Sequence, residues 1–434
     1  MNHVDDTDVL DHLRRENQRL QRSVLELSVL NDVATAIGST LALDEIIDLI
    51  IEKCVKHFRV EQGAVLLLDE RQDRVSFRTM VRKLDTAGYR QPYRLDAELS
   101  GWMLKHRRPL IVNDLASDER FSSAGAAPFE IRSLLAAPLM LKNKMVGLIC
   151  LFNKKLPEGF TSNDQRLLSI LAVESAQVIE NARLYQEEQE LRRVQEELRV
   201  ASDIQRGLLP KAFPEIGGYD IAAVNLPARV VSGDYYDFIH LPDGQLGFCL
   251  GDVSGKGMPA ALLMANLQAI MRAQVLLGLS PQASIENVNF LLFHNTTPEK
   301  FATLFFGVLD PSDHTLTYCN AGHDPPFLFS AGGAVQRLET GGTVVGFLEK
   351  MKFAEDRVSL GPGDVLLLYS DGVTEAMNVR EEEFGEERLQ RVAQSMLGQP
   401  AAALISAVLA AVRGFTGDRS ASDDITVLAI RRAH

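Results

Sequence analysis

The sequence predicts a multidomain α+β protein of 434 residues. This length suffices for two or three domains of roughly 100 to 200 residues each, and a hydrophobic content of 46% can fill several cores. Short apolar runs bounded by turn residues alternate with helical patterns over residues 36–182 and 210–434. Residues 5–35 and 183–209 show helical periodicity alone. The expected order is an N-terminal helix, an α+β domain, a helical linker and a second α+β domain.

The composition argues against several kinds of partner. A formal net charge of −13 disfavours binding to a nucleic-acid backbone, which requires clustered Lys and Arg. The N-terminal residues contain no apolar signal region, and the stretch AAALISAVLAAV is shorter than the ~20 residues of a membrane span. The cysteines form no CxxC pair and lie in separate apolar runs, as expected for reduced core residues of a cytoplasmic protein: Cys54, Cys150, Cys249 and Cys319.

The first helix, residues 5–35, carries a heptad pattern. Its core positions alternate in steps of three and four and are filled by Leu10, Leu13, Asn17, Leu20, Val24, Leu27, Asn31 and Ala34. Leucine mostly at d and asparagine at two a positions favour a parallel two-stranded coiled coil, and thus a homodimer. An amphipathic helix packed on its own domain is the open alternative, because three heptads are near the minimum for the pattern.

Residues 36–182 predict an α+β domain of sensor size. The expected elements are a helix over 43–58, strands near 63–70 and 74–82, a helix within 100–112, and strands over 134–141 and 145–152. Strands outnumber helices, and helices bracket them, which predicts an α+β unit.

This segment resembles a GAF domain in the order of its elements and in the stretches 101–121 and 137–168. Asn153, Lys154, Phe160 and Asp164 match the spaced motif of the cyclic-nucleotide-binding GAF subgroup, with Gln165 in place of the final Glu. The resemblance implies an antiparallel sheet with flanking helices and a small ligand, such as a cyclic nucleotide. The alternative is that Lys154 and Asp164 form a structural ion pair between the last strand and the following helix.

Residues 165–209 predict one long charged helix, whose part from 183 to 209 links the two domains. An imperfect apolar seam runs along it through Leu184, Leu191, Val194, Leu198, Ala201 and Leu208, and its remaining core positions are filled by Glu187 and Gln205. Pro210 ends the helix because proline cannot continue it. A signalling coiled-coil linker and a rigid spacer are both compatible with this pattern.

The C-terminal segment repeatedly places an aspartate beside an apolar strand. Two strands joined by the turn at 242–244 carry Asp234 and Asp252, Asp371 follows a third strand, and Asp423 and Asp424 precede the last. A single aspartate at a strand end is ordinarily a turn or N-cap residue. Four carboxylates from distant strands would repel one another if gathered without cations, whereas with two divalent metals they form a hydrolytic centre.

The motifs SGDYYD, GDVSGKGMPAALLM, YCNAGHDPPFLF, LYSDGVTEA and SDDITVLAI resemble, in this order, the PPM (protein phosphatase 2C-like) superfamily, in its stage II sporulation protein E and sigma-regulatory branch. The resemblance implies an αββα sandwich over 210–434 with two Mn²⁺ or Mg²⁺ ions. It implies that Asp252 bridges the ions and that the Val253 carbonyl completes one shell. The other implied ligands are Asp234, Asp371 and Asp423, with Asp424 as the alternative at the last position.

Further residues have less certain roles. Arg229 matches an arginine position of relatives and is a candidate phosphate ligand, with a solvated surface arginine as the alternative. Asp237 is expected to support the metal ligands or to cap a turn, and His323 to belong to loop structure. Ser254 stands where eukaryotic relatives have a histidine. The stretch GDVSGKG is not a Walker loop, since its glycine spacing is wrong and a glycine follows Lys256.

The leading hypothesis is a metal-dependent serine/threonine protein phosphatase acting on a phosphorylated anti-sigma-factor antagonist and controlled by the GAF domain through the linker. One alternative is a catalytically quiescent PPM fold that binds a ligand and a phosphorylated partner. Another is a small-molecule phosphoesterase with the same centre. No nucleic acid or membrane is expected as a partner.

Overall fold

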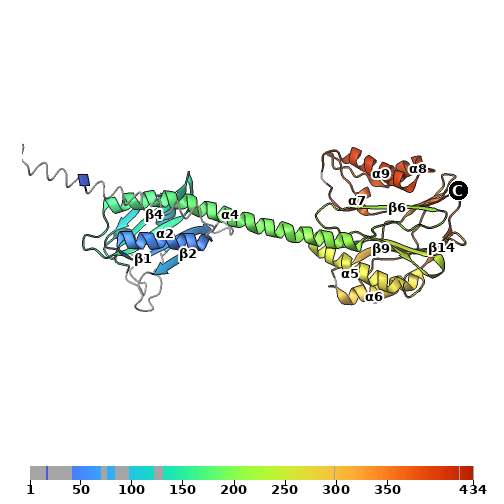
Figure 1. Cartoon of the computed structure of the whole chain (residues 1–434), viewed down its shortest axis with the longest axis horizontal. Coiled ribbons are helices and arrows are strands. Elements are labelled where there is room, and N and C mark those ends of the chain that lie inside the picture. Colours follow the sequence, from blue (N-terminus) through green and yellow to red (C-terminus); the bar gives the residue numbers. More distant parts are fainter. Residues whose placement is uncertain are drawn as a thin grey trace, which may run out of the picture. The chain divides into compact units, whose positions relative to one another are not determined.

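A computed structural model describes residues 16–17, 42–69, 76–83, 97–121, 131–297, 299–419 and 421–433. The chain divides into two compact units, Met1–Arg193 and Val194–His434 (Figure 1). The predicted coiled coil over 5–35 lies outside the described residues except for Glu16 and Asn17, so it stays a prediction.

The N-terminal unit is built on an antiparallel sheet with the strand order β2-β1-β5-β4-β3. Its elements are α2 (Leu43–Phe58), β1 (Val60–Asp69), β2 (Ser76–Lys83), α3 (Ala97–His106), β3 (Leu110–Val112), η1 (Glu119–Phe121), β4 (Leu134–Leu141), β5 (Lys144–Lys154) and the start of α4 (Ser162–Leu208). One core joins α2 and α4 to the sheet, and a second core lies under α3. The expected sheet with flanking helices is present.

The predicted helix within 100–112 is shorter than expected. Helix α3 ends at His106, and Leu110–Val112 form the edge strand β3. Arg107 adopts a positive φ of 48°, and Pro109 follows it, which favours an extended chain at Arg108. The apolar run LIV therefore belongs to the sheet.

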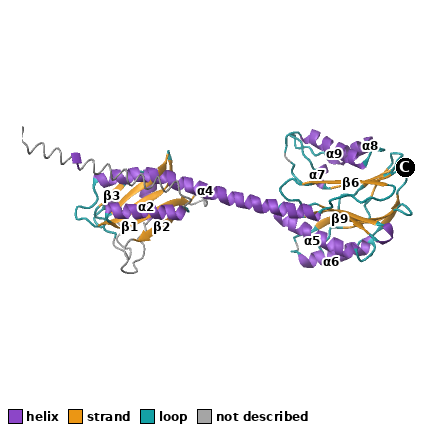
Figure 2. Cartoon of the chain, viewed as in Figure 1, coloured by secondary structure: helices purple, strands orange, loops and turns teal. Residues whose placement is uncertain are grey.

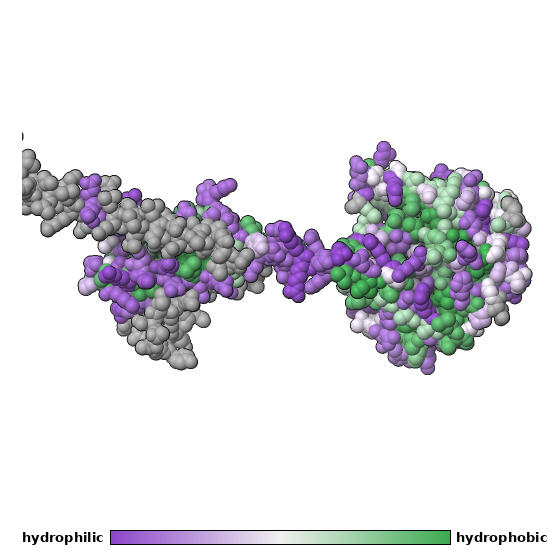
Figure 3. Space-filling model, in the orientation of Figure 1, coloured by the Kyte–Doolittle hydropathy of each residue, from purple (hydrophilic) through white to green (hydrophobic). Residues whose placement is uncertain are grey.

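Helix α4 spans 47 residues, Ser162–Leu208, and includes the predicted linker. Its first turns bury Leu167, Leu168 and Leu171 in the core of the N-terminal unit. The middle of the helix is mainly hydrophilic (Figure 3) and carries ion pairs at i,i+4 spacing, such as Arg192 with Glu188 and Arg199 with Asp203. Such pairs stabilise an exposed helix by about 0.2–0.5 kcal/mol each.

The C-terminal unit contains two sheets, with the orders β13-β10-β9-β8-β7 and β12-β11-β15-β16-β6, and β14 pairs with β10. Its elements are β6 (Tyr219–Leu226), β7 (Tyr235–His240), η3 (Pro242–Gly244), β8 (Leu246–Val253), α5 (Met258–Val275), α6 (Pro281–Asn295), β9 (Ala302–Asp310), β10 (Thr315–Ala321), β11 (Phe327–Phe329), β12 (Val335–Arg337), β13 (Gly341–Gly342), β14 (Asp356–Ser359), β15 (Val365–Tyr369), α7 (Asp371–Thr374), α8 (Gly385–Ser395), α9 (Ala401–Thr416) and β16 (Ile425–Arg432).

These elements form four layers, as Figure 2 shows for this unit. Helices α5 and α6 cover one sheet and α8 and α9 cover the other, each through its own apolar core. A third core, which includes Phe248, Leu366 and Leu428, lies between the sheets. Because side chains alternate along a strand, each strand contributes one set of residues to this inner core and the other set to a helix layer.

Two predictions about composition can be compared with the structure. All four cysteines are buried and free, as expected for core residues. Among the described helices, none combines the length and the apolar character that a membrane span requires.

Candidate functional site

Asp234 and Asp252 lie at the same end of the β7–β8 hairpin. The hairpin turns at Pro242–Gly244, where Gly244 has a φ of 77°, and its register pairs Tyr235 with Gly251. The start of β7 and the end of β8 are therefore neighbours. Asp252 alternates in phase with Phe248 and Leu250, which belong to the inner core, so its carboxylate lies on the face toward the second sheet.

Asp234 is connected to the opposite sheet. Thr426 Oγ1, at the start of β16, donates a hydrogen bond of 2.5 Å to Asp234 Oδ2. Thr426 is held in turn by Ser370, whose Oγ accepts the Thr426 N–H at 2.9 Å. Asp234 is 1% exposed. Two sheets thus meet at this carboxylate, and Thr426 and Ser370 are site residues that the sequence analysis did not identify.

The remaining aspartates lie next to strands of the opposite sheet. Asp371 opens α7 directly after β15, and Asp423 and Asp424 precede β16, whose Val427 pairs with Tyr369 of β15. Gly372 permits the close approach of these segments, because a Cβ atom there would collide with the Asp424 carbonyl oxygen. These strand ends therefore place their carboxylates near enough for the charges of Asp371 and Asp423 to act on Asp252.

The electrostatics of the cluster are those of unneutralised acids. Burial, and then the negative charges of Asp371 and Asp423, raise the pKa of Asp252 to about 7, and its carboxyl group shares a hydrogen bond with Asp234. Burial and the charge of Asp252 raise the pKa of Asp234 well above its usual range. Burial and Asp423 raise the pKa of Asp371 to about 6. The cluster has a strong excess of negative charge that a cation would relieve.

Asp423 has a cationic partner from the turn after β8. Lys256 Nζ donates to Asp423 Oδ2 at 2.5 Å and to the Ser422 carbonyl oxygen at 3.0 Å. Gly255 and Gly257 flank this lysine with φ values of 103° and 74°, so the predicted glycine turn is present. The glycine spacing excluded a Walker loop here, but no local pattern indicated that the turn directs an ammonium group to the aspartates.

Asp424 has a different environment from the other acids. Its Oδ1 accepts the Ala228 N–H and its Oδ2 accepts the Gly233 N–H, both at 2.7 Å. Both carboxylate oxygens thus hold the loop between β6 and β7. This favours a role in fixing that loop, next to Asp234, over a role as a direct ligand.

The donor set suits a hard divalent cation, since every candidate is a carboxylate or, at Val253, a backbone carbonyl. The ammonium group of Lys256 shows that the cluster accepts a positive charge at Asp423. Among the residues that the structure describes, no group of three or more His, Cys, Asp or Glu side chains lies close enough to surround an ion as the side chains are placed here.

Of two further predicted residues, Asp237 lies away from the cluster and Arg229 lies near it. Asp237 does not support the cluster: Tyr235 and Asp237 lie on the helix-facing side of β7, where Arg272 of α5 donates to both Asp237 oxygens at 2.7 and 3.0 Å. The alternation of side chains along β7 separates it from Asp234. Arg229 is exposed, and its Nη1 lies 3.9 Å from where a Cβ of Gly257 would be. Together with Lys256 and Lys300, which borders Gly255, it forms a basic rim.

His323 belongs to loop structure behind the site, as expected. Its backbone N–H donates to Asn320 Oδ1 at 2.8 Å, and its ring Nδ1 lies 2.9 Å from Thr303 Oγ1. Thr303 pairs with Asp252 in the β8–β9 register and accepts the Asp252 N–H at 3.3 Å. Burial lowers the pKa of His323 to about 4, so the ring is neutral at pH 7.

In the N-terminal unit, the motif residues have structural partners. Lys154 Nζ lies 3.0 Å from Asp164 Oδ1, so the predicted ion pair is confirmed. Asn153 Oδ1 accepts the Arg132 N–H at 2.7 Å, and the buried Phe160 donates its N–H to Asn113 Oδ1. None of these four residues lines the cavity of this unit.

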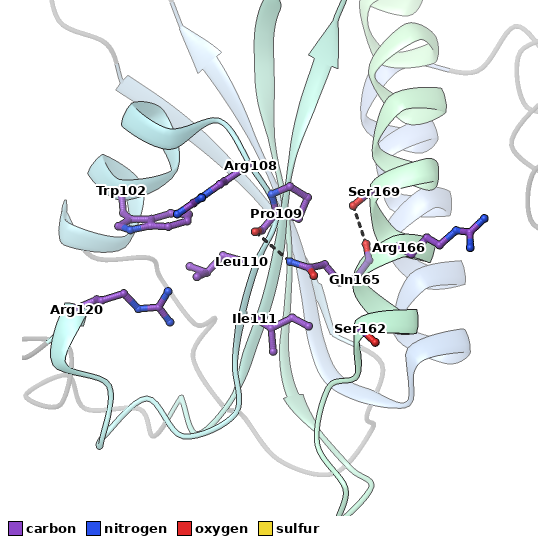
Figure 4. Close-up of a pocket in the computed structure, with 10 residues that line it drawn as sticks. All are labelled: Trp102, Arg108, Pro109, Leu110, Ile111, Arg120, Ser162, Gln165, Arg166 and Ser169. Atoms are coloured by element: carbon purple, nitrogen blue, oxygen red, sulfur yellow. Dashed lines mark hydrogen bonds between the residues drawn. The ribbon is translucent and has the colours of Figure 1, made fainter.

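That cavity, of about 610 Å³, lies beside the edge strand β3 (Figure 4) and is lined by Trp102, Arg108, Pro109, Leu110, Ile111, Arg120, Ser162, Gln165, Arg166 and Ser169. The guanidinium groups of Arg108 and Arg120 lie 5.5 and 5.9 Å from the Trp102 ring centre. Gln165 Nε2 donates to the Pro109 carbonyl at 3.1 Å. A glutamate at 165 could not make this bond. The lining therefore contains three arginines and no acid.

Comparisons with known proteins agree with both units. A family model for stage II sporulation protein E matches residues 242–433, and a GAF domain model matches residues 40–180. Phosphoserine phosphatase RsbU of Bacillus subtilis is 31% identical over 255 residues, which cover 57% of this chain and 75% of RsbU. Protein IcfG of Synechocystis is 32% identical over 263 residues, which cover 54% of this chain but only 41% of IcfG.

Among solved structures, the SiaA-PP2C domain of Pseudomonas aeruginosa has a TM-score of 0.51 at 22% identity, covering 56% of this chain and 98% of that domain. At this identity the likeness concerns the fold alone. By the extent of the sequence matches, this chain belongs to the stage II sporulation protein E family of PP2C-type serine phosphatases and carries an N-terminal GAF domain.

Proposed function

We propose that the protein is a metal-dependent phosphatase that hydrolyses phosphoserine or phosphothreonine on a regulatory protein. The observation that carries this proposal is that the segments bearing Asp234, Asp252, Asp371 and Asp423 meet at one edge of the two sheets, where the charges of Asp252, Asp371 and Asp423 raise the pKa values of neighbouring acids. Acids gathered at such a cost in electrostatic energy point to a cation-binding centre.

In this proposal Asp234, Asp252, Asp371, Asp423 and the Val253 carbonyl would hold two Mn²⁺ or Mg²⁺ ions. Asp424, whose oxygens hold the β6–β7 loop, would be the alternative at the Asp423 position. The bound ions supply an activated water and offset charge on the phosphate oxygens. Residues of the chain hold the parts in place: Thr426 and Ser370 orient Asp234, and Thr303 orients the Asp252 backbone.

The basic rim gives the centre a means of binding the substrate phosphate. Arg229, Lys256 and Lys300 border the glycine turn after β8, and Arg229 is close enough for its charge to act on Lys256. Arg229 offers a planar fork that suits a phosphate monoester. We propose that Arg229 binds the substrate phosphate and that Lys256 lies beside it, in contact with Asp423.

The substrate we propose is a phosphorylated anti-sigma-factor antagonist. The support is the resemblance to the sigma-regulatory branch and the similarity to the phosphoserine phosphatase RsbU. A protein substrate also agrees with an open, surface-accessible rim, since Arg229 and Lys256 are exposed.

The test is phosphate release by the purified chain from a phosphoserine peptide and from candidate phosphorylated antagonists, with Mn²⁺ or with a chelator. We expect activity with Mn²⁺ only, and Asp252→Asn lowering kcat by about two orders of magnitude or more. Asp310→Asn, at a turn aspartate that binds Ser312, is the matched control and retains activity. No metal-dependent release, and no effect of Asp252→Asn, would exclude the enzyme.

The alternatives predict other results. A quiescent partner-binding protein shows no cation binding by calorimetry but captures the phosphorylated partner. A small-molecule phosphoesterase has a higher kcat/KM for p-nitrophenyl phosphate than for phosphoproteins. The same preparation distinguishes all three functions.

We propose that the GAF domain binds a small anionic ligand such as a cyclic nucleotide in the cavity beside β3. Arg108 supplies positive charge, Arg120 contributes while paired with Asp118, and Gln165 keeps the lining free of carboxylates. Calorimetric titration with cyclic AMP and cyclic GMP is the test. Arg108→Gln weakens binding, whereas Lys142→Gln, in the turn between β4 and β5 and outside the lining, is the control. Absence of heat with both nucleotides would exclude this ligand class.

We propose that ligand binding acts on the phosphatase through α4 and that the chain is a cytoplasmic homodimer. Leu184, Leu191 and Val194 of the predicted seam are exposed in the single chain, at 51%, 61% and 44%. They lie at heptad spacing on one helix, which suits pairing with α4 of a second copy.

A further inference from the structure

The last turns of α4 contain one buried amide. Gln205 is 7% exposed and makes two hydrogen bonds with the same residue of the β6–β7 loop. Its Nε2 donates to the Ser232 carbonyl oxygen at 2.7 Å, and its Oε1 accepts the Ser232 N–H at 2.9 Å. The side chain thus satisfies both backbone groups of Ser232, as a neighbouring strand would.

Ser232 connects Gln205 to Asp234. Ser232 Oγ accepts the Asp234 N–H at 3.0 Å and a hydrogen bond from Asn225 Nδ2 at 3.2 Å. Between them, Gly233 donates its N–H to Asp424 Oδ2. The three residues 232–234 belong to no helix or strand. They are therefore held from three directions, by α4, by β6 and by the segment before β16.

We propose that Gln205 is a positioning residue for Asp234, which makes the end of α4 a part of the phosphatase centre. This inference rests on the proposed function, in which Asp234 is a metal ligand. Glutamine offers one donor and one acceptor at the end of a side chain of the required length. A glutamate keeps the acceptor but loses the donor, and a methionine of similar length loses both.

The contact also gives α4 a direct connection to the centre. A helix turns by about 100° for each residue, so rotation of α4 by one position would remove Gln205 from Ser232. The loop would then lose the contact that orders it from the helix side. A signal that reaches the end of α4 would thus change the position of a metal ligand without moving either sheet.

The test compares Gln205→Met and Gln205→Glu with Gln268→Met in the full chain. Gln268 is a matched control, because it is 8% exposed and its Nε2 donates to the Leu208 carbonyl at the end of α4 but does not contact the loop. We expect Gln205→Met to weaken Mn²⁺ binding by calorimetry at least tenfold and to lower kcat more than it raises KM. The effects of Gln205→Glu on Mn²⁺ affinity and kcat are intermediate. Gln268→Met changes Mn²⁺ affinity, kcat and KM by less than threefold each. Equal behaviour of Gln205→Met and Gln268→Met would overturn the inference.

Amide hydrogen exchange separates this inference from the proposed function. In metal-free protein, the Ser232 and Asp234 amides exchange faster in Gln205→Met than in the wild type and in Gln268→Met. This result supports the positioning role even if the wild type binds no Mn²⁺, in which case only the proposed function fails. Unchanged exchange at these amides excludes the role. If Gln205→Met does not fold, the exchange rates of the Ser232 and Asp234 amides in Gln205→Glu test the positioning role instead.

Discussion

At the scale of single residues, the aspartate cluster has opposite effects on stability and on function. Asp252 lies beside Asp234 and under the influence of Asp371 and Asp423, and burial adds to the cost of its charge. Polar contacts from Thr426 and Ser370 offset part of this cost for Asp234. A site of this kind is held together by the surrounding fold, since the acids themselves favour separation.

Asp252→Asn is therefore expected to stabilise the metal-free protein at pH 8, by about 1–2 kcal/mol, because it removes one of several mutually repelling charges. The wild type gains about 2.7 kcal/mol at a Mn²⁺ concentration 100 times its Kd, and the variant gains much less. Chemical unfolding with and without Mn²⁺ measures both effects. An equal gain from Mn²⁺ in both proteins would show that the ion binds elsewhere.

Lys256 is expected to compete with a metal ion for Asp423, since its ammonium group lies 2.5 Å from Asp423 Oδ2. Lys256→Met removes a positive charge from the cluster and should tighten Mn²⁺ binding by roughly three- to tenfold. Lys300→Met, on the same rim but beside Gly255, is the control. Calorimetric titration gives the affinities, and weaker binding in Lys256→Met would contradict the competition.

His323 predicts a pH dependence of stability. The pKa of the folded ring is about 4, below the unfolded value of 6.5. Between these values the unfolded chain binds the proton first, so this residue's contribution to stability is complete above pH 6.5 and is lost as the pH falls toward 4. The loss amounts to at most about 3 kcal/mol. Buried acids with raised pKa values, such as Asp371, have the opposite slope.

The comparison of wild type with His323→Gln isolates this effect. The variant is less stable at pH 7, because it loses the contact with Thr303. Its deficit in the free energy of unfolding should shrink as the pH falls from 6.5 to 4.5, since glutamine does not titrate. A deficit that stays constant over this range would show that His323 is not responsible.

At the scale of elements, the site depends on close contacts between the segments that carry the proposed ligands. The α7 start lies against the segment before β16 only because residue 372 is glycine. Gly372→Ala should lower the free energy of unfolding by about 2 kcal/mol or more and weaken Mn²⁺ binding, since it pushes Asp371 away from Asp423. Gly414→Ala in α9 has open space around it and should be neutral or stabilising by up to about 1 kcal/mol. Thermal unfolding of the two variants makes the comparison, and equal midpoints would refute the packing argument.

At the scale of the whole molecule, α4 belongs to both units, because its first turns are buried in one core and its end contacts the loop before β7. The exposed seam between these ends is the proposed dimer contact. Light scattering should give the mass of a dimer, and Leu191→Glu should shift it toward the 47.9 kDa chain. Arg193→Glu, at a neighbouring position off the seam, should leave the mass unchanged. A monomeric wild type would contradict the dimer.

Much of the architecture was accessible from local sequence patterns. Helical periodicity over 165–209 predicted α4, and the Pro-Asp-Gly turn predicted the β7–β8 hairpin, because both signals depend on nearby residues. The aspartates beside strands were visible for the same reason. The predicted helix within 100–112 was wrong at Leu110–Val112, because pairing with β4 makes this segment an edge strand and not a continuation of α3.

Short-range patterns and motifs were enough to predict the order of the elements, the two domain types and the candidate metal ligands. The groups that support those ligands became visible only in the folded chain. Thr426 contacts Asp234 across 192 positions, Lys256 contacts Asp423 across 167, and Gln205 contacts Ser232 across 27. No local periodicity encodes such pairs, because each arises when two sheets and the end of a helix are packed against one another.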